Sequence, residues 1–373
     1  MKASEYKQVA QVLGLFANVR ESAEPPESLI GVQVSDGVAK LIAGKGLARF
    51  GQGVVVTLDG AFSGKHAYTI SARPFLQAAK VIGGKQEVEF DISDKGLTIV
   101  TSEGGKVFLK VEGDLREAGF PKKPREFKVE SRIPAEAFTQ LAKVFDTVHA
   151  DYEIEAPSME QVGNVSHFVV VQPAGRAMYG HFEAQGSGPD GYFASVYPQF
   201  WRSMRHLDAE GLIKWGEDGA LAVSGPYELY STPYRVSKYD SRTRRSEEPR
   251  NPDPWPIMSL SGAPSVSFTI DKKPLVEAVK GVMPHDEHGR VVLTVKEGYL
   301  NVAAFGQEGG MTVPAETLHD GNRACNAEYL LKLLRAIDGK SVTIGWAQQP
   351  AMILSAPEMK GWTILLAPIA LNT

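Results

Sequence analysis

Apolar residues recur at helical spacing in six short stretches, and each stretch is followed by segments in which apolar and polar residues alternate. The second of these stretches, Pro74–Ile82, begins with a proline and ends at a glycine pair. Four others begin near Pro134, Pro198, Asp271 and Asn326. The first stretch, Glu5–Val19, carries one apolar stripe made of Tyr6, Val9, Ala10, Leu13 and Phe16.

Two of the predicted helices are preceded by a side chain that can accept hydrogen bonds from free backbone amides. Asp271 stands before the fifth helix, which ends at Gly281, and Asn326 stands before the sixth, which ends near Gly339. We therefore expect both residues to cap their helices.

Strand signals follow each helix. Behind the second helix, glycine turns separate three alternating segments that predict an antiparallel meander: Gln86–Ile92, Leu97–Val100 and Lys106–Val111. The sixth helix is followed by the same plan: Ser341–Trp346, Ala351–Ser355 and Trp362–Leu366. Helices that each lead into antiparallel strands predict an α+β fold with a helical layer on sheets, rather than a doubly wound parallel fold.

The six helix-plus-strands units recur about every 64 residues, and pairing them gives three domains. The predicted domains are 1–124, 125–256 and 257–373. A proline-containing polar connector, Phe120–Arg125, supports the first boundary, and the charged, proline-rich segment Ser241–Pro256 supports the second.

Composition restricts the class of protein. The 373 residues exclude a single small module, and 43% hydrophobic with 23% charged residues is typical of a globular chain. Cys325 is the single cysteine, so no internal disulfide and no thiolate zinc site is expected. The first 20 residues show no export signal, and the longest apolar runs have the length of strands. These features predict a soluble, cytoplasmic protein.

Motifs for catalysis and nucleotide binding are weak. Gly60–His66 is one residue short of a phosphate-binding loop, and Gly44–Arg49 is typical of a hairpin turn. His285-Asp286-Glu287-His288 offers possible metal ligands, but it lies between the fifth helix and the predicted strand Val291–Val295, where polar loop residues are expected. One open alternative is an enzyme with a cleft between domains that holds a metal on His285 and His288.

The charge of the chain is unevenly distributed. The formal net charge is −4, yet the six helical segments together carry +6, so the remainder carries −10. A positive helical layer on a negative body suits a surface that binds phosphates without reading sequence.

Several segments resemble the beta subunit of bacterial DNA polymerase III, the DNA sliding clamp. They are the helix beginning at Cys325-Asn326, the ending Ile364–Leu371, the connector Glu117–Pro121, Tyr179-Gly180-His181, and the linker Pro249–Asp253. The unit plan of the whole chain is similar to that family. The chain differs where Ala367, Ala370 and Tyr179 replace the family's Met, Arg and Asp, and it ends with an added Asn372-Thr373.

The resemblance implies a homodimer whose two copies join head to tail into a ring around duplex DNA, with no catalytic residues, no cofactor and no metal. A separate ATP-driven machine, the clamp loader, would open such a ring. The helices would line the hole, and the basic residues expected to face phosphates are Lys7, Arg73, Lys80, Lys143, Arg202, Arg205, Lys272, Lys273, Lys280, Lys332 and Arg335.

The resemblance also implies a pocket for short peptides of a DNA polymerase and of the clamp loader, between the second and third domains. Carried over position by position, it comprises Val165, Met178, Gly180, His181, Phe182, Pro249, Leu365, Pro368, Ile369 and Leu371. We expect Pro368 to interrupt strand pairing and to leave the apolar surface of Ile369 and Leu371 without an internal partner. A second alternative is a protein of the same fold that acts as a binding scaffold and closes no ring.

Overall fold

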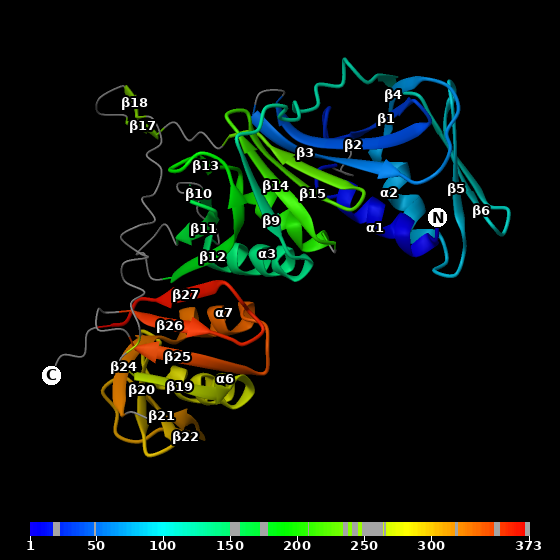
Figure 1. The fold of residues 1–373 in the computed structure, drawn as a ribbon. Coiled ribbons are helices and arrows are strands. Elements are labelled where there is room, and N and C mark those ends of the chain that lie inside the picture. Colours follow the sequence, from blue (N-terminus) through cyan, green and yellow to red (C-terminus); the bar gives the residue numbers. More distant parts are fainter. Residues whose placement is uncertain are drawn as a thin grey trace. The chain divides into compact units, whose positions relative to one another are not determined.

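The computed structural model describes residues 1–17, 23–47, 50–149, 157–171, 178–207, 209–233, 238–240, 245–247, 264, 266–317, 320–346 and 351–369. The chain forms two compact units (Figure 1). Unit 1 comprises residues 1–139 and 203–234, and unit 2 comprises residues 140–202 and 235–373.

Unit 1 is built on a nine-stranded antiparallel sheet with the order β8-β4-β1-β2-β3-β16-β15-β14-β9. Strand β3 pairs with β16 from Val56 opposite Tyr227 to Gln52 opposite Ser231, which joins segments far apart in the sequence. The strands are β1 (Leu29–Ser35), β2 (Val38–Leu47), β3 (Phe50–Leu58), β4 (His66–Ser71), β8 (Gly113–Asp114), β9 (Val129–Ile133), β14 (Gly211–Gly216), β15 (Gly219–Ser224) and β16 (Tyr227–Ser231).

A second, three-stranded sheet of unit 1 has the order β5-β6-β7, with β5 (Val88–Ser93), β6 (Gly96–Thr101) and β7 (Lys106–Lys110). The N-terminus covers the outer edge of β5, because Met1 and Val88 exchange two backbone hydrogen bonds of 2.9 and 2.8 Å. Helices α1 (Ala3–Leu13) and α2 (Ala72–Val81) pack together. The buried Tyr6 ring of α1 lies edge-on to Phe75, and its hydroxyl donates to the Phe75 carbonyl at 2.7 Å.

Unit 2 contains a second nine-stranded antiparallel sheet, with the order β13-β10-β11-β12-β27-β26-β25-β19-β23. The pairing of β12 with β27 joins the middle of the chain to its last strand. The strands are β10 (Ser158–Val162), β11 (Val165–Val171), β12 (Met178–Ser187), β13 (Phe193–Ser195), β19 (Val266–Asp271), β23 (Glu316–Thr317), β25 (Ser341–Trp346), β26 (Met352–Ser355) and β27 (Trp362–Leu366).

Unit 2 also contains a four-stranded sheet, β22-β21-β20-β24, and a short hairpin of β17 (Lys238–Asp240) and β18 (Arg245–Glu247). The C-terminal segment reaches the outer edge of β24, where the Ile369 amide donates to the Ala324 carbonyl at 2.8 Å. The strands of the four-stranded sheet are β20 (Arg290–Lys296), β21 (Tyr299–Ala304), β22 (Met311–Pro314) and β24 (Gly321–Asn326).

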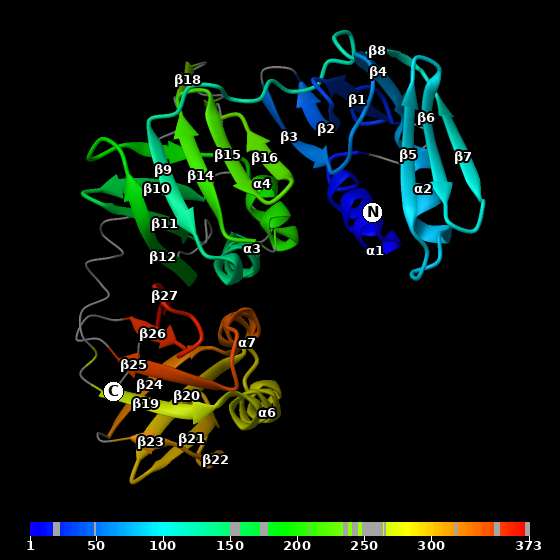
Figure 2. The ribbon, with the colours of Figure 1, turned by 45° about the vertical axis from the view of Figure 1, so that its right-hand side comes forward.

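The helices of unit 2 cover its core. Trp201 of α4 is buried against Phe145 of α3 and Phe168 of β11, with ring centroids 4.7 and 5.9 Å apart. Helices α6 and α7 lie side by side (Figure 2). The bounds are α3 (Ala135–His149, which begins in unit 1), α4 (Pro198–Ser203, followed by a 3₁₀ turn, Met204–His206), α6 (Lys272–Val282, followed by a 3₁₀ turn, Met283–His285) and α7 (Ala327–Ala336).

The predicted α+β fold and all six predicted helices are confirmed, with two corrections. The first helix ends at Leu13, which is earlier than the predicted Val19, and Gly14 is its C-cap residue. Asn326 caps α7, since its side-chain oxygen accepts from the Tyr329 amide at 3.1 Å, but Asp271 forms no such bond and the expected cap on α6 is wrong. The three domain boundaries stay a prediction, and much of the second predicted linker lies outside the described residues.

The glycine-rich segments have structural roles. Gly44 lies in β2 of the predicted hairpin, where a Cβ atom would stand 2.6 Å from the Pro121 ring, so the glycine makes room for the connector. Residues 60–65 form a loop that leads into strand β4, whereas a phosphate-binding loop would lead into a helix. No helix in the described ranges is both long and apolar enough to cross a membrane.

Candidate nucleic-acid and partner interfaces

In unit 1, the predicted cations Lys7 and Lys80 line one hollow. The hollow has a volume of about 770 Å³ between α1 and α2, and Lys45 of β2 lines it too. Leu76 and Phe16 supply part of its apolar wall. Three ammonium groups and the carboxylate of Glu27 line the hollow, so its formal charge is positive overall, which favours anionic groups.

Four of the predicted cations hold partners of their own within unit 2. Lys143 pairs with Asp338 at 2.8 Å, Arg202 with Asp146 at 2.6 Å and Lys332 with Glu328 at 2.8 Å. The Lys272 ammonium donates to the backbone carbonyl of Ile337 at 2.7 Å. A nearby carboxylate balances the positive charge of Lys143, Arg202 and Lys332. These three side chains therefore attract a phosphate less strongly than an unpaired cation does.

Other predicted cations project from the helices into solvent. Lys80, Lys273, Lys280 and Arg335 are exposed, and none of them makes an ion pair among the residues that the structure describes. Arg73 and Arg205 are exposed as well. The helices therefore carry cations that are engaged by a carboxylate or a backbone carbonyl as well as cations that are exposed to solvent.

The structure brings together the predicted partner residues of β12 and β27. Met178 lies opposite Leu366, and Phe182 lies opposite Trp362. Met178, Gly180 and Phe182 are buried on the side of the sheet that faces α3. At Gly180 a Cβ atom would stand 2.6 Å from Val144 of α3, so this glycine allows the helix to approach the sheet. His181 points to the opposite face, because side chains alternate along a strand.

The other members of the predicted partner pocket are more dispersed. Val165 pairs with Gln185 at the far end of the β11–β12 ladder from Met178, so the two are not brought together. Leu365 is buried in β27. As expected, the strand pairing of β27 ends before Pro368. The Ile369 amide bonds to the Ala324 carbonyl of β24 and the residue is half-buried, but this backbone contact does not test whether its apolar surface lacks an internal partner, which stays a prediction. Pro249 and Leu371 lie outside the described residues.

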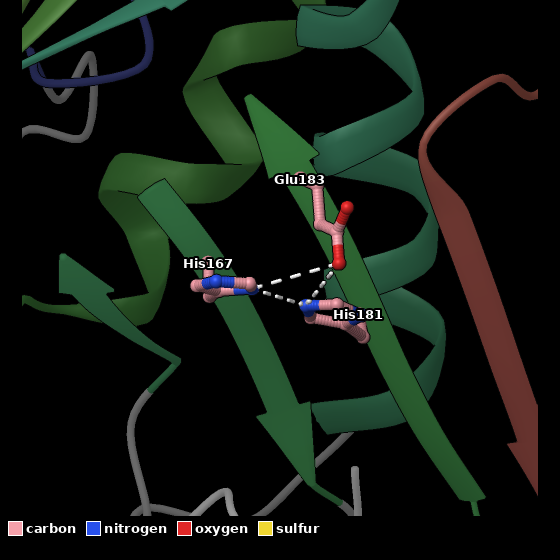
Figure 3. Close-up of side chains that lie close together, drawn as sticks. All are labelled: His167, His181 and Glu183. Carbon is pink, nitrogen blue, oxygen red and sulfur yellow. Dashed lines mark hydrogen bonds and ion pairs between the residues drawn. The ribbon is translucent and has the colours of Figure 1, made fainter. Parts of the chain in front are cut away.

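The neighbours of His181 form a group that the sequence did not reveal. His167 of β11 and His181 and Glu183 of β12 point toward one another (Figure 3). The Nδ1 atom of His167 lies 3.1 Å from Nε2 of His181, and Oε1 of Glu183 lies 3.7 and 3.9 Å from these two nitrogens. Burial, and then the charge of His167, lowers the pKa of His181 to about 4. His181 is therefore neutral near pH 7.

The alternative metal site on His285 and His288 is not assembled. Arg290 binds Asp286 through two side-chain hydrogen bonds of 2.9 and 3.1 Å, and this contact lowers the pKa of Asp286 to about 2. His288 lies beside Glu287 at the surface. Among the described residues, the one group of three or more potential ligands is that of His167, His181 and Glu183.

The two small sheets each end in a strand whose outer edge is unpaired within the described part of the chain: β7 in unit 1 and β22 in unit 2. Large exposed apolar side chains occur on both edge strands and on elements next to them in each unit. Val81 at the end of α2 is 81% exposed and Phe108 of β7 is 56% exposed, while Tyr299 of β21 and Met311 of β22 are 53% and 44% exposed. Of the described residues, Val38 is the one other large hydrophobic side chain with comparable exposure.

No protein-family model matches the sequence, and no curated protein matches it. Solved structures do match the structure of this chain. The beta subunit of DNA polymerase III from Thermotoga maritima superposes with a TM-score of 0.71 over 100% of this chain and 99% of that one, at 14% identity. The chain has the sliding-clamp fold. A Pseudomonas aeruginosa sliding clamp bound to griselimycin gives a TM-score of 0.72 at 16% identity, with 98% of each chain covered. A Helicobacter pylori beta clamp bound to a DNA ligase peptide gives 0.68 at 14% identity, with 99% of each covered.

We predict that Gly180→Ala lowers the free energy of unfolding by about 1–3 kcal/mol, because the new Cβ atom overlaps Val144 and forces α3 away from the sheet. Urea unfolding measures the change. Gly84→Ala is the matched control, since no atom lies within 4 Å of the Cβ built there and the stability should shift by less than about 0.5 kcal/mol. Equal unfolding midpoints for the two variants would show that Gly180 is not needed for packing.

Proposed function

We propose that the protein is a DNA sliding clamp, a non-catalytic ring of two copies that encircles duplex DNA and tethers a DNA polymerase in the cytoplasm. The sliding-clamp fold over the whole chain supports this function. The observation that carries it is the pair of open edges, β7 and β22, because a ring needs two complementary surfaces on each copy.

The two edges have complementary chemistry. An unpaired edge strand presents backbone donors and acceptors that a strand of a second copy can satisfy. Lys106 and Lys110 are the exposed ends of β7, with Glu112 3.9 Å from Lys110, whereas Glu308 and Glu316 lie in the segments before and after β22. The exposed Phe108 and Met311 would be shielded from water in such an interface. In this arrangement β7 of one copy joins β22 of the next, a head-to-tail contact that closes after two copies.

We predict that the protein has a mass of twice 40.5 kDa in solution, and that Phe108→Glu reduces it to 40.5 kDa. A carboxylate in the centre of an apolar strand contact would be buried without a partner, which costs several kcal/mol. Light scattering at micromolar concentration measures the mass. Val38→Glu, at an exposed apolar residue of β2 that belongs to neither edge strand, should remain a dimer. A monomeric wild type would favour the scaffold that closes no ring, and a dimeric Phe108→Glu would place the contact elsewhere.

The helical layer suits a protein that must hold DNA and still slide. Contacts to phosphates carry no sequence information and weaken steeply with salt. The solvent-facing cations Lys80, Lys273, Lys280 and Arg335 can make such contacts, and the balanced cations Lys143, Arg202 and Lys332 keep them few. Weak, exchangeable contacts allow sliding, while the closed ring prevents escape.

We predict that replacing Lys7, Lys80 and Lys280 together by Ala weakens binding to a short linear duplex. The slope of log affinity against log salt should also become shallower, by about 0.9 for each phosphate that the variant no longer neutralises. Fluorescence anisotropy over a range of salt measures both. Replacing Lys65, Lys95 and Lys360, exposed lysines of loops and turns, removes the same charge as a control and should leave the slope unchanged. Equal effects of the two triple variants would mean that the helices do not face DNA.

A partner peptide is proposed to dock beside β12 and β27. The DNA ligase peptide of the Helicobacter pylori clamp complex supports this part of the proposal. In this chain β12 and β27 bring His181, Leu365 and the segment of Pro368 into one region of unit 2. A leucine or aromatic anchor of a polymerase or clamp-loader peptide would supply most of the binding energy there.

A further inference from the structure

We infer that His167, His181 and Glu183 form a binding site for a divalent transition-metal ion of the zinc class. This inference does not depend on the proposed function, since it rests on side chains within a single pair of strands. It concerns the face of the β11–β12 ladder that is turned away from α3 (Figure 3).

Strand register creates the group. His167 lies directly opposite Glu183 in the β11–β12 pairing, and His181 precedes Glu183 by two residues on the same face. Both strands are interior strands of the nine-stranded sheet, so their backbones are held on both sides. The Glu183 backbone amide donates to the Gly361 carbonyl at 3.0 Å, and this hydrogen bond holds the backbone of Glu183 in place. Sites built on such rigid elements need little reorganisation to bind an ion.

The three ligand atoms have the spacing of a metal site. Nδ1 of His167, Nε2 of His181 and Oε1 of Glu183 form a triangle with sides of 3.1, 3.7 and 3.9 Å. The point equidistant from the three atoms lies about 2.1 Å from each, which equals the usual zinc–nitrogen and zinc–oxygen distance. Two imidazoles and one carboxylate favour zinc and its neighbours over magnesium or calcium.

The two facing histidine nitrogens can both act as metal ligands. The two facing nitrogens share one hydrogen bond, so one imidazole is the donor and the other the acceptor. When both nitrogens donate lone pairs to a cation, the shared proton moves to the other nitrogen of its own ring.

The exposure of the group leaves one coordination position open. The side chains of His167 and His181 are 11% and 12% exposed, whereas Glu183 is half exposed. Three protein ligands with access for solvent resemble a zinc site whose fourth position is filled by water or by an added ligand. Because His181 also belongs to the predicted partner pocket, a carboxylate or imidazole of a docked peptide could take that position.

Isothermal titration of the metal-free full-length protein with zinc chloride tests the inference. We expect one ion per chain at this site, with an affinity that falls about tenfold or more in His167→Ala and in Glu183→Gln. Glu183→Gln keeps the size of a half-exposed side chain, so it separates ligand loss from misfolding. His288→Ala, which removes a surface histidine beside a glutamate, should bind zinc like the wild type.

Titration with cobalt chloride adds a spectroscopic readout of the same site. A visible absorption band typical of low-coordinate cobalt with nitrogen ligands should appear in the wild type and in His288→Ala, and should be lost in Glu183→Gln. Absence of stoichiometric binding would show that the histidines are only a hydrogen-bonded pair. Binding that survives both His167→Ala and Glu183→Gln, or that disappears in His288→Ala, would overturn the assignment as well.

Discussion

An antiparallel sheet must end somewhere, and its last strands leave a row of backbone donors and acceptors that need partners. In this protein the chain termini satisfy two of these edges. The first residues cover β5, and the last described residue bonds to β24. The outer edges of β7 and β22 have no such cover in the described structure, and each of the two strands carries an exposed apolar side chain, Phe108 and Met311. The proposed assembly follows from this constraint, since each copy can complete the sheet of the next.

The charges of the helices fit the same account. A protein that bound DNA tightly through many free cations would hold its position, because each phosphate contact adds to the affinity. Here carboxylates or a carbonyl engage four of the basic residues, including Lys143 and Lys272, and only the others are left to contact phosphates. A ring can tolerate weak contacts because its retention depends on topology. A scaffold that closes no ring would need stronger contacts with DNA.

Local patterns predicted much of the fold, because helices and hairpins depend on residues close in the sequence. The meander after α2 and the last three strands were found from alternation and glycine turns alone. The cap on α7 was predicted correctly. The same reasoning failed at Asp271, because a suitable residue type does not guarantee that its side chain turns toward the amides.

Features that depend on strand register or on distant pairing were not predictable from one sequence. Val165 and Met178 were assigned to one pocket, yet the pairing of β11 with β12 separates them. The same pairing brings His167 to Glu183, which are 16 positions apart and show no motif. The open edges were also missed, because a sequence does not show which strand remains unpaired.

Retention on closed circular DNA tests the central claim most directly. The clamp would be loaded on a nicked circle with a cognate or related clamp loader, and bound protein would be counted after gel filtration in high salt, before and after the circle is cut once. The account predicts that most of the protein stays on the circle and leaves within minutes of linearisation, because it slides off the free ends. Equal retention on circular and linear DNA would contradict a closed ring and show that the protein holds DNA by direct contacts.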